Sequence, residues 1–269
     1  MTYCVAIKLD EGLVFASDSR TNAGVDDVRG TSKMRVFASA GERVIVTLSA
    51  GNLSTTQNAL NLLQQRAKHA PDEPGIENAN SMYEVAQRIG DAMREVRARD
   101  DAYLKSSNID PSGTFIVGGQ IAGEDPRLFL VYSEGNFIEN SGQFPYFQTG
   151  ETKFGKPILD RVITPQTSIT EACKTVLVSF DSTIRSNLSV GPPIDLQIVN
   201  RDALIPGARL RLEANDPYLQ AIHEQWNAHL KQLTSHGGPS SAVKESVRAE
   251  PFDEAQDWLC ETRFREVEA

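Results

Sequence analysis

The sequence is poor in residues and patterns that mark several large protein classes. It has only three cysteines, Cys4, Cys173 and Cys260, and four histidines in 269 residues. An odd, scattered set of cysteines does not form a disulfide framework, and together with the lack of a signal peptide it indicates the reducing cytoplasm. The histidines lack metal-ligand spacing, and Gly118-Gly119 lacks the further glycines of a phosphate-binding loop. We therefore expect no metal and no cofactor.

Two further absences concern partners. No apolar run approaches the ~20 residues of a membrane-spanning helix. Acidic residues outnumber basic ones by 36 to 27, which gives a net charge of −9, whereas nucleic acid binding requires a basic face. The chain is nevertheless 40% hydrophobic, which is ample for one large core or two small ones. This composition indicates a soluble globular protein with neither a membrane nor a nucleic acid as its partner.

The most informative stretch that is present is the first eighteen residues. Tyr3 to Leu9 and Leu13 to Ala16 are typical of strands, and Asp10-Glu11-Gly12 between them is typical of a turn. A hairpin that begins at residue two places the start of the chain inside a sheet, although chain ends usually fray. Removal of Met1, which is routine before a small residue, would leave Thr2 with a free α-amine. One residue would then carry a nucleophilic hydroxyl and a base, because an α-amine titrates close to neutral pH.

The rest of the chain alternates runs of strands with pairs of helices, and residues 20–32 between the first two strand pairs are predicted to be a loop. Strand runs separated by helix pairs favour an α+β protein over a parallel sheet. We predict a four-layer αββα sandwich, with two antiparallel sheets between two helical layers. The predicted strands after the hairpin are 33–38, 44–48, 114–117, 128–132, 146–148, 194–199 and 209–212; the predicted helices are capped by Ser54 or Thr55, by Ser81 and by Ser168, with a shorter helix over 154–163.

The character of the sequence changes beyond Asn215. Asp216-Pro217 can cap and start a helix, residues near 234–251 have the composition of a flexible linker, and 252–264 form a last amphipathic piece. We therefore divide the chain into a domain over residues 2–214 and a C-terminal helical extension over residues 215–269. Such a tail docks on its own domain or on a neighbouring subunit, and both possibilities stay open at this point.

Three parts of the sequence together resemble the catalytic half of a proteasome-type β-subunit. They are the strand-initial Thr2, the run Ser17-Asp18-Ser19-Arg20-Thr21 with Lys33 after it, and Ser49-Ala50-Gly51. Such subunits are N-terminal nucleophile hydrolases. The sequence is most similar to the bacterial Anbu family, the ancestral β-subunits. The resemblance covers roughly residues 2–212 in element order and is most specific over residues 2–53.

The resemblance implies a role for each matching residue. Thr2 would be the nucleophile, with its own amine handling the proton. Lys33 would favour the charged transition state, and Asp18 would keep Lys33 protonated and fix its rotamer. Gly51 resembles the glycine whose backbone N–H forms the oxyanion hole, where a side chain would obstruct the substrate. The groove would be lined by Arg20, Thr21 and Asn22, pairing by backbone with an extended peptide as an added strand.

Two positions bear on how far the family pattern holds. The family has a serine that supports the active site, in the turn before the third helix. Thr149 stands at the corresponding position here and keeps a hydroxyl. The family also has a second aspartate, followed three residues later by a serine. In this sequence Ser186 stands at the position of the aspartate, and Ser189 matches the serine. Ser186 is a departure, since it carries no charge and would stabilise an N-terminal ammonium less than an aspartate does. Asp181 is an alternative acidic residue, although it lies well within the predicted helix.

The resemblance implies a threonine-type peptidase or amide hydrolase that works as a homo-oligomer, in a ring or ring-like helix. The reaction would be acyl transfer to Thr2 followed by hydrolysis, on a peptide bond or another amide. Two alternatives stay open. One is a small-molecule amidase, and the other is a non-catalytic scaffold subunit in which Met1 is retained. The sequence identifies neither the substrate nor any ATPase partner.

Overall fold

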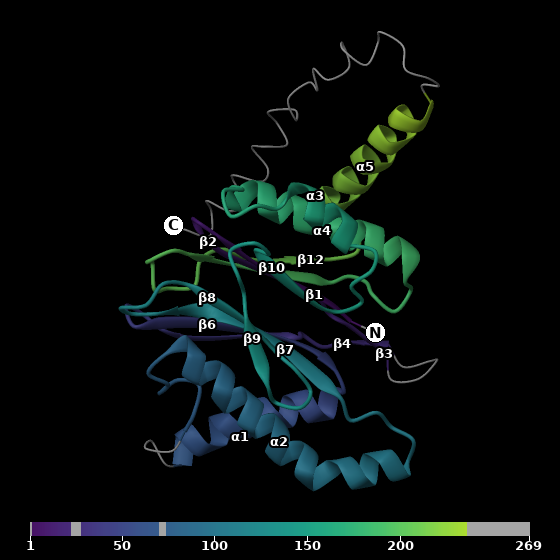
Figure 1. Cartoon of the computed structure of the whole chain (residues 1–269). Helices are drawn as coiled ribbons and strands as arrows, with labels where there is room; N and C mark the ends of the chain where they lie inside the picture. Colours follow the sequence, from purple (N-terminus) through teal and green to yellow (C-terminus); the bar gives the residue numbers. More distant parts are fainter. Residues whose placement is uncertain (1, 23–27, 70–73, 236–269) are drawn as a thin grey trace.

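The computed structural model describes residues 2–22, 28–69 and 74–235. Figure 1 shows two β-sheets stacked face to face, with helices against their outer faces. The sheets are antiparallel throughout, which agrees with the predicted α+β class and excludes a parallel sheet.

The N-terminal hairpin forms the centre of the first sheet. β1 (Tyr3–Leu9) and β2 (Gly12–Asp18) pair antiparallel, which confirms the hairpin predicted at the start of the chain. β10 (Tyr146–Gly150) pairs with the other side of β1. β11 (Ile194–Asn200) pairs with β2, and β12 (Arg209–Leu212) pairs with β11. Strands from distant parts of the chain therefore enclose the hairpin on both sides.

The middle of the chain builds the second sheet. Its strands are, in order, β5 (Met34–Ser39), β6 (Arg43–Gly51), β7 (Gly113–Ile121), β8 (Arg127–Val131) and β9 (Phe137–Glu139). The first four correspond to predicted strands. β9 was not predicted, because a three-residue edge strand is too short to show an alternating pattern.

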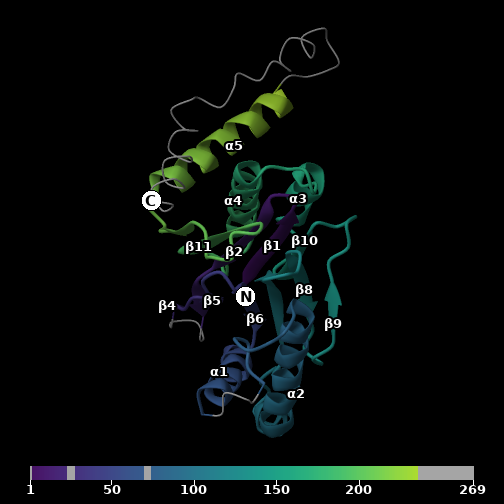
Figure 2. The ribbon, with the colours of Figure 1, turned by 90° about the vertical axis from the view of Figure 1, so that its left-hand side faces the viewer.

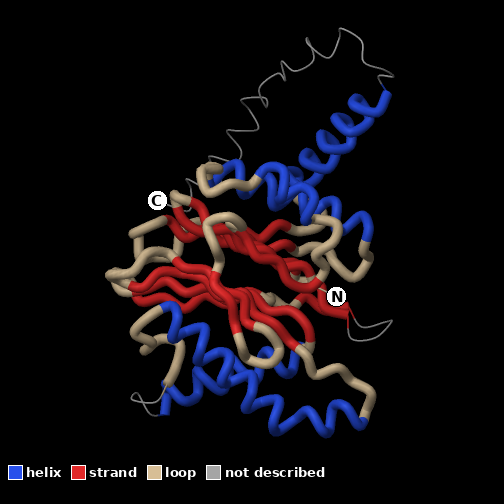
Figure 3. Tube along the Cα trace, in the orientation of Figure 1, coloured by secondary structure: helices blue, strands red, loops and turns tan. Residues whose placement is uncertain are grey.

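Apolar side chains from both sheets fill the space between them. Cys4, Ala6 and Phe15 of the first sheet belong to one buried cluster with Val46 and Leu48 of the second. Figure 3 shows the two layers of strands that enclose this cluster. Because alternate residues of a strand point to opposite faces, their neighbours along β1 face the helices instead.

A pair of helices covers the outer face of each sheet. α1 (Leu53–His69) and α2 (Met82–Ser106) pack on the second sheet. α3 (Lys156–Val162) and α4 (Ile169–Ser186) pack on the first sheet, as Figure 1 shows. Each pair buries an apolar stripe against its sheet, which is the arrangement that the helical periodicity of these segments favours.

The helix caps follow the predicted signals with one exception. Ser81 caps α2 and Ser168 caps α4 through their side chains. The prediction for α1 was wrong, because Asn52, and neither Ser54 nor Thr55, provides the capping side chain by accepting the N–H of Thr55. Asparagine caps a helix as well as serine does, so α1 begins directly after it.

The segment predicted as a loop between β2 and β5 contains two short strands. β3 (Arg20–Asn22) and β4 (Val28–Gly30) pair antiparallel, with Arg20 opposite Gly30. Their polar composition gave no strand signal, because strand formation here depends on pairing with a partner and not on propensity. This hairpin follows β2 directly and lies near the start of the chain in Figure 1.

A fifth helix extends away from the sheets. α5 (Pro217–Ser235) begins where Asp216-Pro217 predicted, and the Asp216 carboxylate accepts the N–H of Tyr218. Ile222 is the buried residue of α5 and packs on the core beside α4. Figure 2 shows the rest of the helix projecting beyond the other helices. The linker was predicted to begin near residue 234, whereas α5 continues to Ser235. The rest of that linker and the predicted piece over 252–264 lie outside the described residues.

Tyr3 anchors the start of β1 from the helical side. Its ring centroid lies 4.5 Å from that of Phe180 on α4. Its hydroxyl contacts the Ser179 hydroxyl at 3.0 Å and accepts the Gln148 amide at 2.7 Å. Burial raises the pKa of the Tyr3 phenol, so the ring stays neutral and both hydrogen bonds persist. The residue after Thr2 is thus fixed by packing and by hydrogen bonds.

Replacing Phe180 with alanine is expected to lower the free energy of unfolding by about 3–5 kcal/mol, because it leaves a cavity beside Tyr3. Urea unfolding at one fixed protein concentration measures the change, since assembly makes stability concentration-dependent. Tyr103→Ala, at a side chain 77% exposed, is the control and should change this free energy by less than about 0.5 kcal/mol. Equal small effects of the two substitutions would contradict the anchoring role.

Candidate active site

Thr2 directly precedes β1, and the chain after β10 runs alongside it. The residue is 9% exposed, and its carbonyl accepts the N–H of Glu151 at 2.6 Å. Gly150 makes this approach possible. Its φ is +84°, and a Cβ at this position would come within 2.0 Å of the Thr2 oxygen. A side chain at residue 150 would therefore force the two strands apart.

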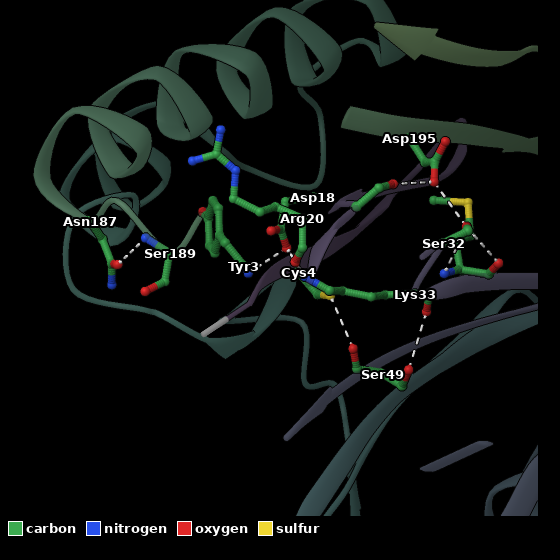
Figure 4. A network of polar contacts seen from close by, with 12 residues as sticks. Tyr3, Cys4, Asp18, Arg20, Ser32, Lys33, Ser49, Asn187, Ser189 and Asp195 are labelled. Atoms are coloured by element: carbon green, nitrogen blue, oxygen red, sulfur yellow. Dashed lines mark hydrogen bonds and ion pairs between the residues drawn. The ribbon is translucent and has the colours of Figure 1, made fainter. Parts of the chain in front are cut away.

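The Asp18 carboxylate joins the N-terminal strand to a lysine. Asp18 ends β2, and its Oδ1 accepts the main-chain N–H of Tyr3 at 3.0 Å and the ammonium of Lys33 at 2.7 Å. Figure 4 shows both contacts meeting at the same carboxylate. The peptide nitrogen of Tyr3 is bonded to the carbonyl carbon of Thr2, so this one oxygen places the Lys33 ammonium close to Thr2.

The charge state of Asp18 depends on that lysine. Burial raises the pKa of Asp18 above its ordinary value, and the Lys33 ammonium opposes the rise, helped by the N–H groups of Tyr3 and Gly191. Within the described chain, Oδ2 is buried and lacks a hydrogen bond of ordinary geometry, although the Gly191 N–H is near enough to act on the pKa. The carboxylate therefore depends on Lys33 for its negative charge near neutral pH.

Lys33 is held by a second acceptor as well. It directly precedes β5, its side chain is 5% exposed, and its ammonium donates to the carbonyl of Arg20 at 2.7 Å in addition to Asp18. An ammonium has three donors, and the described contacts use two of them. One N–H of Lys33 is thus available for a neighbouring oxygen.

Arg20 fixes the loop after α4 against the site. Its guanidinium donates to the carbonyl of Leu188 at 2.9 Å and lies against Gly191, while the N–H of Ser19 donates to the carbonyl of Pro193 at 2.8 Å. Figure 4 shows the Arg20 side chain directed toward this loop and away from Lys33. The Arg20 side chain thus holds the loop after α4 in place.

The other two residues expected to line the groove follow Arg20 in β3. Thr21 lies opposite Arg29, and Asn22 lies opposite Val28. One side of the β3 backbone is therefore paired within the chain. A peptide that adds to this strand would do so along the other side.

Gly51 lies in the second sheet, at the end of β6 and opposite Gly113. Its φ is +94°, and a Cβ there would come within 2.4 Å of the Ser112 oxygen. The fold alone therefore requires glycine at this position. The N–H of the next residue, Asn52, is taken up by the Ser112 carbonyl at 2.7 Å.

Thr149 is positioned differently from the other expected residues. It lies opposite Cys4 in the β1–β10 pairing, and its hydroxyl contacts that of Thr114 on β7. This contact connects the two sheets. The residue that reaches the main chain of Thr2 is Glu151, two positions later, and the sequence comparison with the family pattern did not identify it.

The loop after α4 brings a second unexpected residue to the same place. Ser186 is exposed at the end of α4, whereas Asn187 is buried and donates its side-chain amide to the Glu151 carboxylate at 2.9 Å. Ser189 is half-buried and donates its N–H to the Asn187 side-chain oxygen at 3.0 Å. The helix thus presents its neutral C-cap residue, and not Ser186, to the chain beside Thr2.

Asp181 does not serve as the missing acid in this structure. Its Oδ1 contacts the Nδ1 of His223 on α5 at 2.6 Å, so its side chain faces α5. His223 in turn contacts the Asn227 amide through Nε2 at 2.9 Å. Asp181 therefore belongs to the contact between α4 and α5.

A buried aspartate that sequence reasoning missed supports the site from the first sheet. Asp195 on β11 is 1% exposed and accepts the hydroxyls of Ser19 and Ser32 at 2.8 and 2.9 Å. Arg211 on β12 neutralises it at 2.8 Å. Ser32 directly precedes Lys33, so this cluster fixes the approach of the lysine, as Figure 4 shows. A lone aspartate between apolar strand residues was the signal available.

The described residues hold no group of three or more His, Cys, Asp or Glu side chains that could bind a metal. In the same ranges, no helix combines the length and apolarity required to cross a membrane. A groove of about 1340 Å³ lies between α3, α4 and α5, lined in part by Phe154 and Trp226. It includes none of the residues around Thr2, so it is separate from the candidate site.

Replacing Lys33 with methionine is expected to raise the pKa of Asp18 further, because it removes the positive charge that opposes the effect of burial. Carbon-13 titration of the aspartate carboxyl groups in wild type and variant measures the change. Lys105→Met, at an exposed lysine 3.2 Å from Asp101, should leave Asp18 unaffected. An Asp18 pKa that stays the same or falls in Lys33→Met would contradict the coupling.

Comparisons with protein-family models and with curated proteins gave no match. Solved structures do match. The "Helical Assembly of the Anbu Complex" from Pseudomonas aeruginosa is 48% identical, with a TM-score of 0.83 over 90% of this chain and 99% of that one. Anbu (ancestral beta-subunit) from Yersinia bercovieri is 44% identical, with a TM-score of 0.83 over 89% and 99%. Anbu from Hyphomicrobium sp. strain MC1 is 45% identical, with a TM-score of 0.81 over 89% and 100%.

These identities extend over nearly the whole length of the matched chains, and the arrangement of strands and helices agrees with them. The resemblance inferred from Thr2, Asp18, Lys33 and Gly51 is thereby confirmed at the level of the family. The chain belongs to the Anbu family of ancestral β-subunits.

Proposed function

We propose that this chain is a threonine-type N-terminal nucleophile hydrolase that cleaves a peptide bond or another amide in the cytoplasm. Its hydrolase domain is a four-layer αββα sandwich over residues 2–214, and a C-terminal extension begins with α5. Membership of the Anbu family, whose members are homologues of proteasome β-subunits, supports the proposal. The contacts around the start of β1 support it independently.

The observation that carries the proposal is the shared oxygen of Asp18. Oδ1 accepts both the Tyr3 N–H and the Lys33 ammonium, so the first strand and the lysine are positioned by one buried atom. A structural ion pair alone would not need to contact the peptide that follows Thr2. The arrangement suits a lysine that acts on the first residue of the mature chain.

The chemistry follows from removal of Met1. Thr2 then has a free α-amine, which accepts the hydroxyl proton as Oγ attacks the substrate carbonyl. The tetrahedral intermediate collapses when the leaving amine takes up that proton, and an ester to Thr2 remains. Water, activated by the same amine, hydrolyses the ester and restores the enzyme.

Lys33 and Gly51 would stabilise the charges that develop. The unused N–H of Lys33 can donate to the Thr2 oxygen, which favours its alkoxide character. The N–H of Gly51 would donate to the oxyanion, as the family resemblance implies. Thr149 and Ser189 would support the N-terminus with their hydroxyls, and the β3 backbone at Arg20, Thr21 and Asn22 would pair with the substrate.

The active form is a homo-oligomer in this proposal. The relative from Pseudomonas aeruginosa forms a helical assembly, and α5 of this chain offers an exposed surface, with Leu233 78% exposed. Exposed apolar residues along a projecting helix are typical of subunit contacts. A ring or a ring-like helix would satisfy both observations.

The proposal predicts that a peptide epoxyketone forms a covalent adduct with the purified protein. This warhead requires both the Thr2 hydroxyl and a free α-amine, so intact mass should show loss of Met1 and one adduct per chain. Thr2→Ala should abolish the adduct, and Lys33→Ala should slow its formation at least about 100-fold. Lys105→Ala, at an exposed helix lysine, is the control and should react at the wild-type rate.

Retention of Met1 in the assembled protein would contradict the hydrolase and favour a scaffold subunit. Adduct formation without turnover of any peptide, together with hydrolysis of a defined small amide, would assign a small-molecule amidase instead. An adduct that forms equally well in Lys33→Ala would contradict the role of the lysine.

A further inference from the structure

The reaction above requires an ammonium at the N-terminus of Thr2 at one stage of each cycle. A buried ammonium is stabilised by a nearby carboxylate. Asp18 does not supply this charge alone, because the Lys33 ammonium at 2.7 Å already balances its negative charge. Another carboxylate beside Thr2 would complete the charge balance.

Glu151 lies directly beside Thr2. Its N–H donates to the Thr2 carbonyl at 2.6 Å, and Gly150 before it has no side chain that could stand between them. Residue 151 is thus the first residue after β10, and its main chain lies next to the start of β1. Glu151 itself is half-buried, so water screens its charge only in part.

Neutral donors hold the Glu151 carboxylate in place. Oε1 accepts the N–H of Lys153 at 3.1 Å, and Oε2 accepts the side-chain amide of Asn187 at 2.9 Å. Asn187 is fixed in turn, since its side-chain oxygen accepts the N–H of Ser189 at 3.0 Å and its own N–H donates to the Thr183 carbonyl at 2.8 Å. The carboxylate is therefore oriented by two neutral donors, one from its own loop and one from the C-cap of α4, without being neutralised.

The buried acids of the first sheet are paired with cations. Asp18 is paired with Lys33, and Asp195 is paired with Arg211. Glu151 differs from them, because its contacts in the described part of the chain are with neutral groups only. A full negative charge beside Thr2 is left for a cation that appears later, and removal of Met1 creates one.

We infer that Glu151 is a catalytic residue whose carboxylate binds the α-amine of mature Thr2, with Asn187 as its positioning residue. The inference rests on the proposed function and names the group that takes the place of the second aspartate. When the amine accepts the Thr2 hydroxyl proton, Glu151 stabilises the resulting ammonium, and the proton then passes to the leaving amine. Glu151 itself gains and loses no proton.

The charged groups around the amine act in opposite directions. Lys33 lowers the pKa of the amine, whereas Asp18 and Glu151 raise it; Arg20 faces the loop after α4, where Asn187 and Ser189 are neutral. Because Asp18 is neutralised by Lys33, Glu151 is the group that keeps the pKa of the amine near neutrality. Its removal should therefore make the amine a weaker base.

The test measures the pKa of the Thr2 amine directly. Protein that begins with Thr2 is produced by cleaving a ubiquitin fusion, and the rate of amine acetylation by acetic anhydride is followed against pH by mass spectrometry. Glu151→Gln should lower the amine pKa by about one unit. Well below that pKa, acetylation should become about tenfold faster. Glu134→Gln, at an exposed glutamate in the turn after β8, is the matched control and should leave the pKa unchanged.

A double variant separates charge from structure. In Glu151→Gln with Asn187→Asp, the new amide can donate to the new carboxylate, so the hydrogen bonds return and the charge moves one side chain away. The amine pKa should then lie between those of wild type and Glu151→Gln. An unchanged pKa in Glu151→Gln, or an equal fall in Glu134→Gln, would overturn the inference.

Epoxyketone labelling of the same preparations keeps the two proposals distinguishable. An amine pKa that depends on Glu151 in protein that forms no adduct would support the inference and contradict the hydrolase. An adduct in protein whose amine pKa is independent of Glu151 would support the hydrolase and overturn the inference. The acetylation rate needs no substrate, so neither result depends on identifying one.

Discussion

The described structure around Thr2 depends on a buried carboxylate that accepts two donors of different kinds. Asp18 is completely buried, and its Oδ1 accepts a main-chain N–H of β1 and the ammonium of Lys33. A buried charge is tolerated only where it is paired and hydrogen-bonded. The pair therefore fixes the relative positions of β1, β2 and the start of β5, and any change to one member leaves the other charge buried without its partner.

The sheet explains why these residues can meet at all. β1 is an interior strand, with β2 on one side and β10 on the other, so the end of the chain is held by two ladders and by Tyr3 packed on Phe180. A terminal residue normally frays. Here the backbone of Thr2 is hydrogen-bonded to Glu151, and the residue that carries the hydroxyl directly precedes a strand that cannot shift without breaking the ladders on both of its sides.

The fold and the candidate site were predictable from the sequence to different extents. The hairpin and the helix pairs follow from local patterns of apolar residues, turns and caps. The Asp18–Lys33 contact follows from the family resemblance, which places one residue at the end of a strand and the other at the start of a strand. The β3–β4 pairing and β9 were not predicted, since short polar strands have no periodic signal. Glu151, Asn187 and Asp195 were missed for another reason: their contacts form between elements that only the completed fold brings together. A neutral C-cap and a lone strand aspartate are weak signals in one sequence.

The positions around Glu151 show how a site can keep its charge balance while its residues change. Ser186 is exposed, so an aspartate at that position would start from the solvent-facing end of α4. The negative charge beside Thr2 comes instead from the chain after β10, and the helix supplies only the neutral Asn187 that orients it. Electrostatics near an N-terminus depend on where the charge lies and not on which element carries it. Aligning residues by spacing therefore predicts a missing acid at Ser186, whereas the folded chain has an acid next to Thr2.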